Sequence, residues 1–338
     1  MRKRTRYSLL LMLALIAALT VALILRKSAP PETARLLPES DAIVYANLKP
    51  LRAATHFERS PVLHSPEYQH FIDATGIVPE RDLDAAAFAL HRMDDPNGPN
   101  GPVGYSEVFE GRFDGQRLAG YLATIATAKE TYAGHDIYTI SVGDGKIMRP
   151  LRIAQLGYDT IAASNMPMAE QIHSILDRHR AAASPFSGSS LLSARYRDVP
   201  AFSSAWAIGH IGLPFSDRGY ISVFGLQLPL PEDTTFVASL RYLGSLHLRI
   251  EQIAPTDADA VHATETLGTL LNLFRSVQQA QTQLQPHASD AAFREMTDSM
   301  KIERHKDRAV LTANIPLELV KQLATPAVAP AIETPIQP

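Results

Sequence analysis

The sequence predicts an α+β fold in which helices cover antiparallel sheets, arranged as two related tandem halves and preceded by one transmembrane helix. Three observations predict it: an uncharged apolar segment near the N-terminus, β-like runs that alternate with amphipathic helical patterns, and a hairpin–helix pattern that occurs twice. Of the 338 residues, 46% are hydrophobic and 20% are charged. This balance is typical of a globular protein that buries a core.

The apolar segment, residues 8–25, would be roughly 27 Å long as a helix, close to the ~30 Å hydrocarbon core of a membrane. Four basic residues precede it, whereas only Arg26 and Lys27 follow it closely. An excess of Lys and Arg marks the cytoplasmic side. We therefore expect a single-pass inner-membrane protein whose C-terminal body lies on the periplasmic side. A cleaved signal peptide is the alternative, because Thr20 and Ala22 are small residues at the required spacing.

Composition divides the chain into six parts. Charge and proline content predict a tether after the apolar segment, and the Pro- and Ala-rich C-terminus predicts a disordered tail. The parts are a basic cytoplasmic tail (1–7), the transmembrane anchor (8–25), the tether (26–37), the first α+β half (38–200), the second α+β half (201–324) and the tail (325–338).

Within the first half, Asp114 is placed to cap a helix whose apolar residues recur at helical spacing. In the second half, Thr256 and Asp259 form a capping box at the start of a long helix. Strands are expected at 42–48, 86–92, 104–113, 137–142, 151–156, 160–164, 205–211, 221–228, 235–243, 246–253, 301–304 and 308–315, and further helices at 67–74, 168–180 and 317–323.

The repeat consists of a hairpin, an Asn-x-Pro-x sequence and a helix. The sequence is NMPM at 165–168 and NIPL at 314–317. Proline suits the first helical turn, where its missing N–H costs nothing, so Pro167 and Pro316 are each expected to begin a helix.

Charge and cysteine content exclude several functions. Once the four N-terminal basic residues are removed from the total of 32, 28 remain against 35 acidic residues. Such a body repels phosphate backbones, which argues against a nucleic-acid partner. With no cysteine, disulfides, thiolate zinc sites and a cysteine nucleophile are excluded. No sequence pattern indicates a metal or a cofactor, so neither is predicted.

Four residues are candidates for a ligand pocket. His135 and Asp136 are a neighbouring imidazole and carboxylate at a turn, a combination that can serve acid–base chemistry. His210 lies on the same expected strand as Trp206, between two glycines that permit close backbone approach. Each also has a plain structural reading, as a turn residue or as a histidine packed on a strand.

The chain resembles uncharacterised bacterial envelope proteins, a domain family of unknown function with an N-terminal anchor and a duplicated α+β body. The segments that carry the resemblance are 37–41 (LPESD), 76–84 (GIVPERDLD), 111–122 (GRFDGQRLAGYL) and 132–140 (YAGHDIYTI). The resemblance implies location and shape, and it implies no functional residues.

These observations favour a membrane-anchored, non-enzymatic binding or assembly module of the envelope, with the membrane and an envelope protein as its partners. Two alternatives remain open. One is an envelope hydrolase whose site forms only in the fold. The other is a small-ligand or lipid carrier that uses a groove between the two halves.

Overall fold

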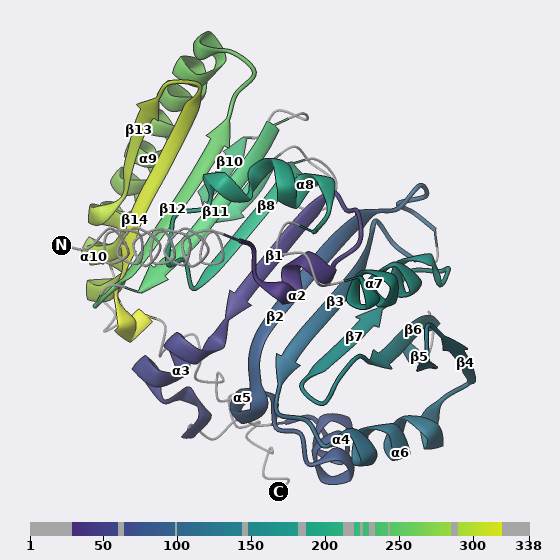
Figure 1. The fold of residues 1–338 in the computed structure, drawn as a ribbon. Helices are drawn as coiled ribbons and strands as arrows, with labels where there is room; N and C mark the ends of the chain where they lie inside the picture. The colour runs from purple at the N-terminus through teal and green to yellow at the C-terminus, as the bar shows by residue number, and fades with distance from the viewer. Residues whose placement is uncertain are drawn as a thin grey trace, which may run out of the picture.

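The computed structural model describes residues 29–59, 64–98, 100–143, 148–181, 187–211, 220–223, 226–229, 234–242, 244–284 and 290–319. Its centre is one antiparallel sheet that runs through both halves of the chain (Figure 1). In sheet order its 12 strands are β13 (Lys301–His305), β14 (Arg308–Ile315), β12 (Leu246–Ile253), β11 (Thr234–Tyr242), β8 (Ala205–Ile211), β1 (Ala42–Asn47), β2 (Leu83–Arg92), β3 (Val103–Gly111), β7 (Thr160–Ser164), β6 (Met148–Gln155), β5 (His135–Gly143) and β4 (Ala128–Tyr132).

Helices cover both faces of the sheet (Figure 1). The first face carries α2 (Glu32–Leu36), α7 (Glu170–Arg180), α8 (Ser190–Arg195) and the 3-10 helix η2 (Tyr196–Asp198). The second face carries α4 (Pro66–Thr75) and α6 (Gly115–Ile125) over the first half, and α9 (Asp257–Leu284) and α10 (Asp290–Ser299) over the second. The remaining elements are α3 (Leu48–Thr55), η1 (Phe57–Arg59), α5 (Pro79–Asp82), and a separate ladder of β9 (Tyr220–Val223) and β10 (Leu226–Pro229).

Strand alternation decides which residues form each core, because successive side chains point to opposite faces. On the first face, Ile43 of β1 and Ile208 of β8 belong to the same buried cluster as the inward side of α7. Ile172, Ile175 and Leu176 of that helix are fully buried.

The predicted fold class is wrong. We expected the sheets of two tandem halves, but one sheet continues across the boundary, where β1 pairs antiparallel with β8 from Ala42–Gly209 to Ala46–Ala205. The physical reason is that β1 and β8 would otherwise both be edge strands with unpaired backbone groups. Within the described residues, no helix is long and apolar enough to cross a membrane. The segment 8–25, predicted to be transmembrane, lies outside the described residues.

The order of strands is nevertheless the same on both sides of this boundary. Outward from it the order is β1-β2-β3-β7-β6 on one side and β8-β11-β12-β14-β13 on the other. In each case three successive antiparallel strands are followed by a hairpin whose second strand lies on the inner side. The boundary between β1 and β8 is therefore the centre of the repeated arrangement.

The helices after the two hairpins differ from what the prolines predicted. Pro167 does not begin a helix, since α7 begins at Glu170. Arg152 holds the intervening segment by donating hydrogen bonds to the carbonyl oxygens of Met166 (2.7 Å) and Pro167 (3.0 Å). Pro316 directly precedes helical residues 317–319, and the rest of that expected helix lies outside the described residues.

The structure confirms the helix caps predicted at Asp114 and Thr256. The Asp114 carboxylate accepts hydrogen bonds from the backbone N–H groups of Gln116 and Arg117, each at 3.1 Å, at the start of α6. Thr256 Oγ1 accepts the backbone N–H of Asp259 at 3.2 Å and donates to its carboxylate at 2.7 Å. By contrast, α2 forms inside the predicted tether and buries Leu36, so these residues belong to the folded body.

Candidate functional site

An aromatic cluster lies where the two halves of the sheet meet. Tyr45 of β1 and Trp206 of β8 are paired directly across the boundary, and their rings stack with centroids 5.4 Å apart. Tyr196 of η2 meets the Trp206 ring edge-on, also at 5.4 Å. Trp206 and Tyr45 are buried, so the cluster is part of the core as well as the floor of the cavity described next.

A cavity of about 630 Å³ opens over this cluster, and we call it the junction cavity. Its volume falls within the roughly 300–1,000 Å³ usual for small-ligand sites. Besides the three aromatic residues, its walls include Pro31, the loop 199–203 that leads into β8, and Arg197 of η2. The walls are mainly apolar, and the polar groups are few.

Three side chains in the wall of the junction cavity, those of Tyr45, Tyr196 and Arg197, carry hydrogen-bond donors. Burial raises the pKa of Tyr45 to about 12, with a further contribution from the charge of Glu110, and burial also raises the pKa of Tyr196. Both phenols therefore keep their protons at neutral pH. Within the described residues, neither tyrosine hydroxyl makes a hydrogen bond, and the side chain of the exposed Arg197 makes neither a hydrogen bond nor an ion pair. Three donors are thus available to a ligand.

Phe202, on the loop before β8, is unusual in two ways. Its side chain is 88% exposed although it lines the junction cavity. Its φ is +63°, a left-handed conformation that is costly for a bulky residue. Strained backbone of this kind persists where the surroundings determine it and is concentrated at ligand-binding sites.

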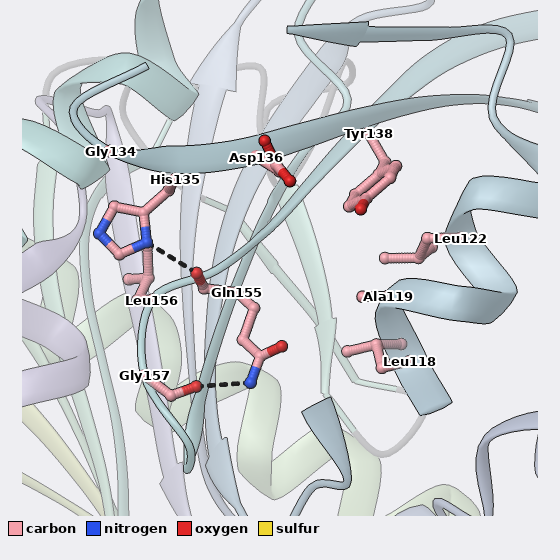
Figure 2. Close-up of a pocket in the computed structure, with 10 residues that line it drawn as sticks. All are labelled: Leu118, Ala119, Leu122, Gly134, His135, Asp136, Tyr138, Gln155, Leu156 and Gly157. Atoms are coloured by element: carbon pink, nitrogen blue, oxygen red, sulfur yellow. Dashed lines mark hydrogen bonds between the residues drawn. The ribbon is translucent and has the colours of Figure 1, made fainter. Parts of the chain in front are cut away.

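A second cavity, of about 380 Å³, lies between α6 and the ends of β5 and β6, and we call it the α6 cavity. Figure 2 shows Asp136, Tyr138 and Gln155 on the sheet side, opposite Leu118 and Leu122 of α6. The Gln155 side chain donates from Nε2 to the carbonyl oxygen of Gly157 at 2.8 Å.

His135 and Asp136 both line the α6 cavity, but they do not form an acid–base pair. As neighbours on β5 they point to opposite faces of the sheet. The His135 ring lies 5.6 Å from the His179 ring of α7, and its Nδ1 is 2.9 Å from the carbonyl oxygen of Gln155. The Asp136 carboxylate instead binds Lys129 at 2.8 Å and accepts from Thr131 at 3.0 Å, contacts that lower its pKa.

The other two candidates are also separated. Trp206 lines the junction cavity, whereas His210, four residues further along β8, lines neither cavity. His210 is exposed, and its Nδ1 lies 3.3 Å from Thr235 Oγ1 on β11. The structure thus distributes the four predicted residues over two cavities and a strand surface.

Sequence reasoning missed Tyr45, Tyr196, Arg197 and Phe202. These residues come together only through the pairing of β1 with β8 and the position of η2, so no local spacing could have found them. Among the described residues, no group of three or more His, Cys, Asp or Glu side chains could hold a metal ion.

Comparison with known proteins adds little. No family model matches the chain, and no curated protein matches it. The structure of TP0453 in crystal form III is similar with a TM-score of 0.45 and 10% sequence identity, over 87% of this chain and 98% of that chain. The TP0453 structure in crystal form I gives a TM-score of 0.46 and 8% identity, over 86% and 96%. Similarity at this level carries no argument about function.

Proposed function

We propose that this protein is a non-enzymatic binding module of the bacterial envelope, which holds a small amphipathic acid in the junction cavity. The observation that carries the proposal is the combination of an aromatic floor with three donors that have no partner within the described residues. The apolar body of the ligand would lie against Trp206 and Tyr45. Its acidic group would accept hydrogen bonds from Arg197 and a tyrosine hydroxyl.

The chemistry of these groups favours binding over catalysis. A phenol whose pKa is raised to about 12, as for Tyr45, is neither a base nor a nucleophile at neutral pH. A guanidinium likewise keeps its proton and acts as a fixed donor. A hydrolase built on His135 and Asp136 is disfavoured, since the two side chains lie on opposite faces of the sheet.

A pair of fluorescent dyes tests the proposal. Anilinonaphthalene sulfonate carries an acidic group on an aromatic body, and N-phenylnaphthylamine has the same rings without the charge. The full-length chain should bind both dyes saturably. Arg197→Gln should weaken sulfonate binding about tenfold, which is ~1.4 kcal/mol, and should leave binding of the neutral dye unchanged.

Arg304→Gln on the outer strand β13 is the matched control, because it removes an exposed arginine away from the cavity. It should change neither affinity. The proposal is wrong if Arg197→Gln and Arg304→Gln bind the sulfonate equally well, or if the wild-type chain shows no saturable binding of either dye.

The envelope location is a further part of this proposal and rests on the sequence alone, through the basic residues that precede residues 8–25. Protease added to cells with a permeabilised outer layer should digest the folded body. Protection of the body until the inner membrane is broken would contradict this location.

A further inference from the structure

A row of polar side chains lines the α6 cavity, and none of them lines the junction cavity. On β5 and β6, Asp136 and Gln155 directly flank the paired residues Ile137 and Ala154, which are fully buried in the core of the first face. Strand alternation therefore places Asp136 and Gln155 side by side on the second face. Thr131 of β4, paired with Asp136, extends the row to the edge of the sheet.

These groups face an apolar wall. Figure 2 shows Gln155, Asp136 and Tyr138 directed into the space in front of α6, where Leu118 and Leu122 form the opposite side. Both leucines and Tyr138 belong to the same buried cluster under the helix. A ligand in this space would meet hydrogen-bonding groups on one side and aliphatic and aromatic carbon on the other.

The Gln155 amide occupies space that is open because the facing residue is a glycine. A Cβ atom on Gly115, the first residue of α6, would lie 2.1 Å from Gln155 Nε2 and 2.6 Å from Oε1. No side chain fits there unless Gln155 moves. The hydrogen bond from Nε2 to the carbonyl oxygen of Gly157 orients this amide, and its Oε1 makes no hydrogen bond within the described residues.

The charges at this site favour a neutral ligand. Lys129 balances the Asp136 carboxylate at 2.8 Å. The carboxylate is acceptor-only and retains lone pairs beyond those used by Lys129 and Thr131. A ligand rich in hydroxyl groups would donate hydrogen bonds to the free acceptors, which are the Asp136 carboxylate and the Gln155 oxygen. The apolar wall would contact a C–H surface on the same ligand.

We propose that the α6 cavity is a saccharide-binding site, in which Asp136 and Gln155 accept hydrogen bonds from sugar hydroxyls while Leu118 and Leu122 pack against the C–H face of the ring. This site is distinct from the junction cavity and does not depend on the function proposed there.

The test uses saturation-transfer difference NMR on the full-length chain, with maltose and N,N′-diacetylchitobiose as probes. At least one of them should bind saturably to the wild-type chain. Gly115→Ala should weaken that binding at least tenfold, because the added Cβ displaces the Gln155 amide without removing any group that contacts the sugar. Alanine is favoured over glycine in helices, so the helix itself should not suffer.

Gly120→Ala is the matched control on the same helix, since nothing lies within 4 Å of a Cβ added there. It should bind as the wild type does. Asp136→Asn, at a half-exposed position, provides a second variant if Gly115→Ala proves unstable, and it too should weaken binding at least tenfold. Anilinonaphthalene sulfonate binding should be unchanged in all three variants, which separates this site from the junction cavity.

Two results would overturn the proposal. One is the absence of saturable binding of both disaccharides to the wild-type chain. The other is binding that is equal in Gly120→Ala and in a folded Gly115→Ala or Asp136→Asn variant.

Discussion

At the scale of single residues, Glu107 on β3 is conspicuous. It lies in a row of directly paired residues that crosses the second face of the sheet from β13 to β5. Every other residue in this row is uncharged. The row consists of Ile302, Leu311, Ile250, Ala238, Ala207, Val44, Phe88, Glu107, Ala163, Ile153 and Tyr138. Burial raises the pKa of Glu107 to about 7. The carboxyl makes no hydrogen bond or ion pair within the described residues.

This raised pKa predicts that stability depends on pH. Below about 4.5 the carboxyl is protonated in both the folded and unfolded chains. As pH rises toward 7, the unfolded chain ionises first, so the folded state is progressively destabilised. Glu107→Gln removes this effect. Relative to the variant, wild type should lose about 1–3 kcal/mol of unfolding free energy between pH 4.5 and pH 8, measured by urea denaturation. A difference that does not change with pH would contradict the prediction.

At the scale of elements, a buried ion network attaches η2 to the second half of the sheet. Arg308 of β14 donates to Glu251 of β12 at 2.8 Å and to Asp198 of η2 at 2.9 Å, and Arg249 adds a bond of 2.7 Å to Glu251. Burial alone would lower the pKa of Arg308, but its two carboxylate partners raise it overall. Since η2 also carries Tyr196 and Arg197, this network positions two walls of the junction cavity.

Arg308→Met should therefore destabilise the protein and weaken its ligand binding. The substitution removes the Arg308 charge that balances the buried carboxylates of Glu251 and Asp198. The free energy of unfolding, measured by urea denaturation, should fall by about 2–4 kcal/mol. Affinity for anilinonaphthalene sulfonate should fall as well, because η2 loses its attachment. Arg304→Met, on the neighbouring strand β13, should change stability by less than about 0.5 kcal/mol. Equal stability of the two variants would show that the network contributes nothing.

The elements predicted correctly are those whose signals are local. The cap at Asp114 and the capping box at Thr256 each act within a few residues of chain. The pairing of β1 with β8 joins strands far apart in sequence, and no local pattern specifies it, so the continuous sheet was missed. The site follows the same rule. Trp206 is a candidate because it is on the expected strand of His210, which lies between two glycines, whereas its ring partners Tyr45 and Tyr196 become neighbours only in the folded chain.

At the scale of the whole molecule, the continuous sheet has a consequence for cooperativity. Independent tandem halves would each bury their own core and could unfold separately. Here the halves share backbone hydrogen bonds between β1 and β8, the Tyr45–Trp206 stack, and the buried pair of Ile43 and Ile208. Opening this boundary would expose two strand edges and apolar side chains from both halves at once.

The two halves should therefore unfold in one transition. Trp206 is the only tryptophan, and it lies at the boundary, so its fluorescence reports the boundary while far-UV circular dichroism reports the whole sheet. In urea the two signals should give the same midpoint, as a two-state transition requires. Ile208→Ala should lower both midpoints together, at a cost of about 2–5 kcal/mol for a buried isoleucine. If fluorescence changed at lower urea than circular dichroism, the boundary would open first. The halves would then be separate folding units that are only docked together.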